Sequence, residues 1–79
     1  MELIIIFKSR NQTLRCANFL RSAGYKSKII DTPLYLYGSC TLSVLTDKAG
    51  FDYFYPSAHS FASFTGAYHL RDGKYTRIF

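Results

Sequence analysis

The sequence has no tryptophan, only two cysteines, only five acidic residues and no long apolar run. Its longest such run, Leu3–Phe7, is far shorter than the roughly 20 residues that cross a bilayer. Met1 and Glu2 in front of it provide no basic start for a secretory signal. Two cysteines are also too few for a small domain built on disulfides, which usually has about four or more. These absences predict a soluble cytoplasmic protein with free thiols.

The residues that are present are typical of one small folded domain. The 79 residues are 48% hydrophobic and 18% aromatic, which is enough for a packed core and excludes intrinsic disorder as the main state. No repeat, linker or low-complexity segment divides the chain, so we expect a single domain over residues 1–79. Ten Lys and Arg residues against five Asp and Glu give a net charge of +5, which favours polyanions or an acidic protein surface as partners.

The first third of the chain predicts a strand followed by a helix. Leu3–Phe7 is apolar at every position and rich in β-branched residues, as in a central strand covered on both faces. Ser9 and Gln12 have the spacing of a capping box, so a helix is expected to begin at about Arg10. The apolar residues of this helix gather on one side, which indicates packing on a sheet, and Gly24 ends it.

Strand-like and helix-like segments then alternate. Tyr25–Asp31 and Cys40–Thr46 are expected to be strands, and the first of them completes a β-α-β unit. The second half gives weaker signals, because Gly50–Pro56 has the character of a strand whereas Ser57–Thr65 has apolar residues at helical spacing. We interpret Ser57–Thr65 as a short second helix.

Asp72 and Gly73 predict a C-terminal hairpin, because this dipeptide adopts the positive φ angles of a two-residue turn. The residues that share one face in this register are Tyr68, Leu70, Tyr75, Arg77 and Phe79. The expected fold class is therefore α+β. It is a two-layer sandwich with a β-α-β start, a mixed or antiparallel sheet of about four to five strands, one main helix, a short second helix and a C-terminal hairpin.

Cys40 is the candidate reactive residue. It follows a Gly-Ser turn and opens a predicted strand, where backbone N–H groups and nearby cations could favour a reactive thiolate. The alternative is a small buried side chain in the core. Cys16 lies on the inner side of the predicted helix, and we interpret it as an inert core thiol.

No other catalytic set is visible. His59 and His69, with two scattered cysteines, lack the spacing of a metal site. No acid is placed to orient either imidazole beside Cys40. We therefore expect no metal site, no cofactor and no hydrolytic active site.

Basic and tyrosine residues are the candidate binding groups. Cations are concentrated in the first third, where the start of the predicted helix could offer N–H groups to an anion. Tyrosines provide flat surfaces for single-stranded bases and are equally common in protein interfaces. No RNP1, GxxG or Walker pattern is present, so binding of nucleic acid rests on charge and tyrosine alone. The candidates are Lys8, Arg10, Arg15, Tyr35 and Tyr37.

The first half of the sequence also resembles a known family. The matching residues are Ile4–Ser9, Leu14, Leu20, Gly24, Ile29–Pro33 and Cys40, which lies seven residues after the proline. Over about residues 3–45 they are similar to the DUF3343 family of small bacterial proteins, described as selenium or sulfur carriers. The resemblance implies that Cys40 carries the sulfur or selenium and that Thr32 and Pro33 belong to its site. The family pattern has glycine after the cysteine, where this chain has Thr41.

Three functions remain open, and all favour a carrier or binding protein over an enzyme. In the first, Cys40 takes sulfur from a persulfide donor and passes it to an acceptor protein, with Lys8 and Arg10 providing a positive environment. The second is a non-catalytic protein-binding module, such as an inhibitor encoded by a phage or mobile element. The third is nucleic-acid binding through the basic and tyrosine-rich surface. A homodimer through the edge strands Tyr25–Asp31 or Lys74–Phe79 is also open.

Overall fold

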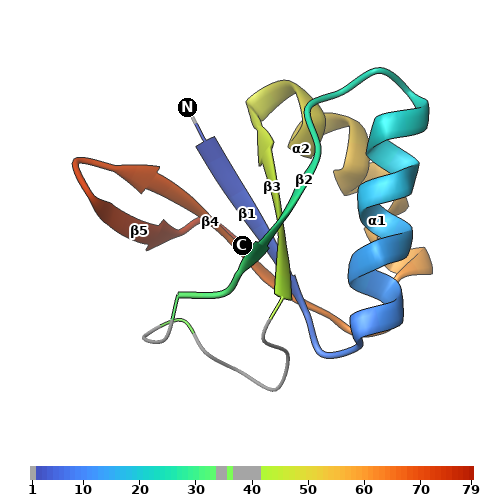
Figure 1. The fold of residues 1–79 in the computed structure, drawn as a ribbon, viewed down its shortest axis with the longest axis horizontal. Coiled ribbons are helices and arrows are strands. Elements are labelled where there is room, and N and C mark those ends of the chain that lie inside the picture. Colours follow the sequence, from blue (N-terminus) through green and yellow to red (C-terminus); the bar gives the residue numbers. More distant parts are fainter. Residues whose placement is uncertain (1, 34–35, 37–41) are drawn as a thin grey trace.

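The computed structural model describes residues 2–33, 36 and 42–79, which form one antiparallel sheet with helices packed against it (Figure 1). The elements in chain order are β1 (Glu2–Phe7), α1 (Arg10–Ser22), β2 (Lys28–Asp31), β3 (Leu42–Asp47), α2 (Lys48–Phe54), the 3₁₀ helix η2 (Tyr55–Ser60), β4 (Phe64–Arg71) and β5 (Lys74–Arg77). The predicted α+β class, with one main helix and one short second helix, is confirmed. No helix in these ranges is both long enough and apolar enough to span a bilayer.

The strand order is β2-β3-β1-β4-β5, with β1 at the centre and every neighbouring pair antiparallel. β1 and β2 are therefore parallel to each other and separated by β3, while β3 and β4 are parallel and separated by β1. The predicted β-α-β unit is thus present in split form. Two such split units with helices between their strands make the ferredoxin-like arrangement, to which β5 adds an outer strand.

The main core lies between the sheet and its helices. Its buried members come from the strands, α1, α2 and the segment after η2: Ile5, Phe7, Cys16, Ala17, Leu20, Val44, Phe54 and Phe61. They stabilise the fold because each buried valine, leucine, isoleucine or phenylalanine side chain contributes about 1.5–3 kcal/mol by leaving water.

The second face of β1 is buried as well. Ile4 and Ile6 are 0% and 2% exposed, although α1 and α2 pack on the opposite face with Ile5 and Phe7. The register sets Ile4 between Leu45 and Tyr68 of the neighbouring strands. β1 is therefore the buried central strand that its unbroken apolar run predicts.

The ends of α1 are fixed by polar contacts. Ser9 Oγ accepts a hydrogen bond from the Gln12 backbone N–H, which is one half of the predicted capping box. The other half is absent, because the Gln12 side-chain oxygen accepts instead from the backbone N–H and the hydroxyl of Ser63, at 2.8 and 2.7 Å. The Ser9 N–H donates to Ser63 Oγ. At the other end, Gly24 has a φ of 85°, the left-handed conformation expected after a helix.

The expectations for the residues around position 50 are wrong. Gly50–Pro56 is not a strand, because Asp47 caps a helix there by accepting the Gly50 N–H at 2.9 Å. The short second helix is therefore α2 and not Ser57–Thr65, a segment that holds the end of η2 and the start of β4. Phenylalanine and tyrosine favour strands in isolation, but here Phe51 and Phe54 pack against the core between α2 and the sheet, and Tyr53 and Tyr55 are exposed.

The predicted C-terminal hairpin is confirmed. Asp72 and Gly73 have φ angles of 51° and 76°, and the register pairs Tyr68 with Arg77 and Leu70 with Tyr75. Phe79 departs from the expected face, because its ring stacks on Phe64 at 5.5 Å and so joins the helix side of the sheet.

The packing of α2 gives a prediction for Gly50. An alanine Cβ at this buried position would overlap Thr46 Oγ1, which already donates a hydrogen bond to the Lys26 carbonyl at 2.7 Å. Gly50→Ala should therefore destabilise the protein by about 1–3 kcal/mol, although alanine favours helices. Urea unfolding followed by circular dichroism measures this change.

The matched control is the neighbouring exposed residue Ala49. Ala49→Gly should cost only about 0.5–1 kcal/mol through backbone entropy. A Gly50→Ala protein as stable as the wild type would contradict the close packing of α2 on β3.

Candidate functional site

The predicted site residues fall into two groups. Cys40, Tyr35 and Tyr37 lie outside the described residues. Lys8, Arg10, Arg15, Thr32 and Pro33 are described, so the site is built from these residues and from the two ends of the connection between β2 and β3.

Four of these five residues lie at the same end of the sheet. The register pairs Ile6 with Ser43 and Asp31 with Leu42, so β1 ends where β2 ends and β3 begins (Figure 1). Lys8 and Arg10 follow β1, and Thr32 and Pro33 follow β2. The connection between β2 and β3 therefore leaves and re-enters the sheet beside the start of α1.

A buried hydrogen bond ties the two ends of this connection together. The hydroxyls of Thr32 and Ser43 are 2.5 Å apart, and the two residues are 7% and 0% exposed. A buried hydroxyl pair is costly to break, because either partner alone loses its hydrogen bond away from water. Thr32 thus fixes where the segment begins, which is a positioning role. Ser43 was missed by sequence reasoning, since a serine inside a strand gives no signal of its own.

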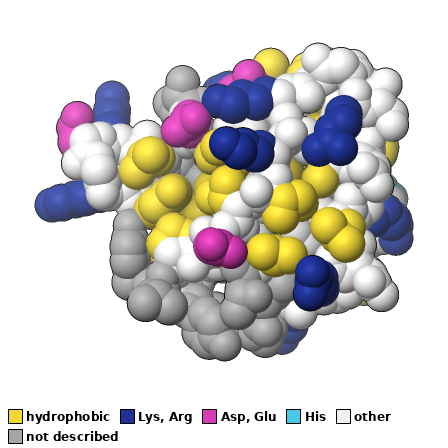
Figure 2. Space-filling view, in the orientation of Figure 1, with side chains coloured by type: hydrophobic (Ala, Val, Ile, Leu, Met, Phe, Trp, Pro, Cys, Tyr) yellow, Lys and Arg dark blue, Asp and Glu magenta, His cyan; other side chains and the backbone are white. Residues whose placement is uncertain are grey.

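The described charges at this end of the sheet are two cations, Lys8 and Arg10, and one carboxylate, Asp31. Lys8 and Arg10 are exposed, and neither forms an ion pair with the described part of the chain. The α1 helix has three arginines and no acidic residue. Two of the five acidic residues form ion pairs away from this end of the sheet, Glu2 with Lys26 and Asp52 with Lys48. Figure 2 shows Lys and Arg side chains, together with Asp and Glu side chains, around a gathering of hydrophobic side chains at the centre of the view.

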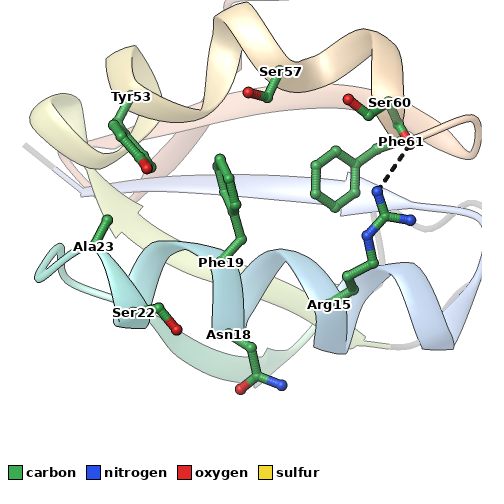
Figure 3. A pocket seen from close by; sticks show the side chains of 9 residues that line it. All are labelled: Arg15, Asn18, Phe19, Ser22, Ala23, Tyr53, Ser57, Ser60 and Phe61. Atoms are coloured by element: carbon green, nitrogen blue, oxygen red, sulfur yellow. Dashed lines mark hydrogen bonds between the residues drawn. The ribbon is translucent and has the colours of Figure 1, made fainter.

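Arg15 does not join this group. It is five positions after Arg10, so helix geometry turns it by about 140° around α1. Its guanidinium lies 4.4 Å from the centre of the Phe61 ring and donates to the Ser60 carbonyl at 3.2 Å (Figure 3). The sequence alone grouped it with Lys8 and Arg10, but the structure places it in a separate groove between α1 and η2.

Cys16 is an inert thiol, as its helical position predicts. It is 0% exposed and packs in the main core. Burial raises the pKa of its thiol from 9.0 to about 12, and the nearby charge of Arg15 opposes this effect only in part. A thiol with this pKa has almost no thiolate at neutral pH, so it is a poor nucleophile.

The histidines form no metal site with their neighbours. Within residues 2–33, 36 and 42–79, no group of three or more His, Cys, Asp or Glu side chains could hold an ion. His59 is exposed on η2, and His69 is half-buried on β4.

A comparison of the sequence with family models gives a match over the first part of the chain. Residues 2–52, which are more than half of the chain, match a family described as "Putative Se/S carrier protein-like". The chain belongs to this family. The match runs from β1 into α2, so it includes Cys40, Thr32, Pro33 and the cations at the start of α1. No curated protein and no solved structure matches the chain.

The raised pKa of Cys16 gives a pH prediction. Because its thiol stays protonated when folded and ionises in the unfolded chain, its contribution to stability is complete below pH 9 and is lost as the pH rises toward 12. In a Cys40→Ser background, the stability of the protein relative to Cys16→Ala should fall by about 1.4 kcal/mol per pH unit above 9. Urea unfolding at several pH values measures this. Parallel profiles for the two proteins would contradict a buried, protonated Cys16.

Proposed function

We propose that this protein carries sulfur or selenium as a persulfide or selenosulfide on Cys40. The observation that carries the proposal is the exclusion of the other thiol. The sequence has two cysteines, and Cys16 is buried with a raised pKa. The match to a Se/S carrier protein-like family and the burial of Cys16 together support Cys40 as the carrier thiol.

The surroundings of the sheet end support this role. Cys40 is two residues before Leu42, so the covalent chain keeps its Cα within about 7.6 Å of the Leu42 Cα. Lys8, Arg10 and the N-terminal end of α1 lie at the same end of the sheet. Positive charge and helix N–H groups favour a thiolate over a thiol, and the thiolate is the reacting form.

The transfer needs no outside oxidant. The Cys40 thiolate attacks the terminal sulfur of a donor persulfide, forming a new S–S bond while the donor's S–S bond breaks. The donor leaves as a thiolate, and Cys40 keeps the sulfur atom. A thiolate of the acceptor then attacks this outer sulfur, and Cys40 leaves as a thiolate. Selenium follows the same path with a Se–S bond in place of the outer S–S bond.

This role requires two protein partners and a reducing compartment. The donor and the acceptor dock in turn, and the exposed cations Lys8 and Arg10 suit acidic surfaces on both. A cytoplasmic location keeps the free thiol reduced. Pairing of two copies through the outer strands β2 or β5 stays a prediction.

The test is intact mass after incubation with a persulfide donor and removal of excess reagent. The wild type and Cys16→Ala should gain one sulfur atom, which a thiol reductant removes, and Cys40→Ser should gain none. Circular dichroism of each protein confirms that it is folded. Uptake by Cys40→Ser, or none by the wild type, would overturn the proposal.

A second candidate rests on the charge of α1 and β2. Arg10, Arg21 and Lys28 are exposed and form no ion pair within the described ranges. Cations held on rigid elements are the usual basis for binding the phosphate backbone of nucleic acids.

Salt dependence separates this candidate from the carrier function. If the basic surface binds a single-stranded oligonucleotide, the affinity should fall steeply as salt rises, because neutralised phosphates release counterions. Replacing both Arg10 and Arg21 by Gln should reduce the slope of log affinity against log salt by about 1.4. Fluorescence anisotropy with a labelled oligonucleotide measures both. Binding that does not depend on salt, or no binding in low salt, removes this candidate.

A further inference from the structure

A groove between α1 and η2 is separate from the sheet end that concerns Cys40 (Figure 3). Its volume is about 490 Å³, within the range of small-molecule sites, which is about 300–1,000 Å³. One wall comes from α1 and the other from α2 and η2. The lining side chains include Arg15, Phe19, Tyr53, Ser57, Ser60 and Phe61. None of them is acidic.

The charged group of this groove is held in place before any ligand arrives. The Arg15 guanidinium is stacked 4.4 Å from the centre of the Phe61 ring, and one N–H donates to the Ser60 carbonyl at 3.2 Å. A guanidinium has five N–H donors, so most remain available to a ligand. A planar cation fixed in this way suits an oxyanion, which accepts two parallel hydrogen bonds from it.

The floor of the groove is aromatic and rigid. The Phe19 ring points from α1 toward the opposite wall, between Tyr53 and Phe61 (Figure 3). The Phe19 ring stacks on the Tyr53 ring, with 5.1 Å between the ring centres. Tyr25 also stacks on the Tyr53 ring, with 4.8 Å between the ring centres. Phe61 is 4% exposed, so its position is set by the core. This floor can cover the apolar part of a ligand without rearranging.

The second wall adds hydroxyl groups. Ser57 and Ser60 are three residues apart in a 3₁₀ helix, so their side chains project from the same side. Neither side chain makes a hydrogen bond to another residue in the part of the chain that the structure describes. They can therefore donate to or accept from a ligand without breaking a contact in the protein.

We propose that this groove binds a small organic acid, with its oxyanion on Arg15 and its apolar body on Phe19 and Tyr53. From Arg15 to Ser22 the groove follows α1 for about 10 Å, which is the length of a small molecule with one ring. The oxyanion is a carboxylate or a phosphate monoester, because both match the guanidinium. None of the residues that line the groove takes part in the proposed sulfur transfer, so the two proposals can be tested separately.

The experiment is an NMR titration of the ¹⁵N-labelled Cys40→Ser protein at constant ionic strength. The probes are benzoate and phenyl phosphate, compared with acetate and inorganic phosphate. The two ring-bearing probes should shift the amide signals of Ser57, Ser60 and Phe61 and bind roughly tenfold more tightly than their ringless counterparts, because the ring leaves water on the aromatic floor. The stronger of the two ring-bearing probes identifies the oxyanion.

Variants of two arginines on the same helix provide the control. Arg15→Gln should weaken binding of the better probe by about tenfold or more. Arg21→Gln should leave it within about twofold, since Arg21 is exposed and does not line the groove. Ser57→Ala tests the groove without disturbing the contact between Arg15 and Phe61. It should weaken binding by about threefold.

Three outcomes would overturn the proposal. They are no shift at the groove with any probe, equal binding with and without the ring, or equal losses in Arg15→Gln and Arg21→Gln. Thermal unfolding of each variant shows whether a loss of binding reflects a loss of folding. If Arg15→Gln is unfolded, the Ser57→Ala and Arg21→Gln titrations decide the question.

Discussion

Packing around Phe7 holds together parts of the chain that are far apart in sequence. Its ring lies 5.9 Å from Phe54, 5.6 Å from Phe61 and 5.9 Å from Phe64, so one side chain of β1 contacts α2, the segment after η2 and β4. The register of β1 against β4 shifts between Ile6 and Phe7, which sets Phe7 opposite Phe64. An irregularity of this kind in the strand pairing changes the direction in which a side chain points. Both candidate sites depend on this cluster, because it fixes where β1 ends and where η2 lies.

The start of α1 is where the two halves of the chain meet. In an isolated peptide, the Gln12 side chain would accept the N–H of Ser9 and complete the capping box of α1. In the protein, its side-chain oxygen accepts hydrogen bonds from Ser63 instead. The same serine accepts from the Ser9 N–H, so one polar network joins the N-terminus of α1 to the segment before β4. The family match ends at residue 52, yet this network shows that the later residue Ser63 helps to hold the start of α1 in place.

The two proposed sites use different sides of the same helix. At its N-terminal end, α1 provides N–H groups and the exposed cation Arg10, which suit an anion. Along its other side it presents Arg15, already stacked on an aromatic ring, to a groove. Because the two regions are separated around the helix, a ligand in the groove leaves the sheet end open to a protein partner.

The sequence by itself determined the strand Leu3–Phe7, the helix from Arg10 to Gly24, the hairpin at Asp72 and the core position of Cys16. In each case the signal is local, because an apolar period, a cap or a turn dipeptide restricts the backbone wherever it occurs. Local signals failed between Gly50 and Thr65, where aromatic residues with strand preference form helices because the Asp47 cap and the core space decide. Only the tertiary structure showed that Thr32 meets Ser43 and that Arg15 meets Phe61. These contacts join residues that are 11 and 46 positions apart, and no pattern within one element determines which elements pack together.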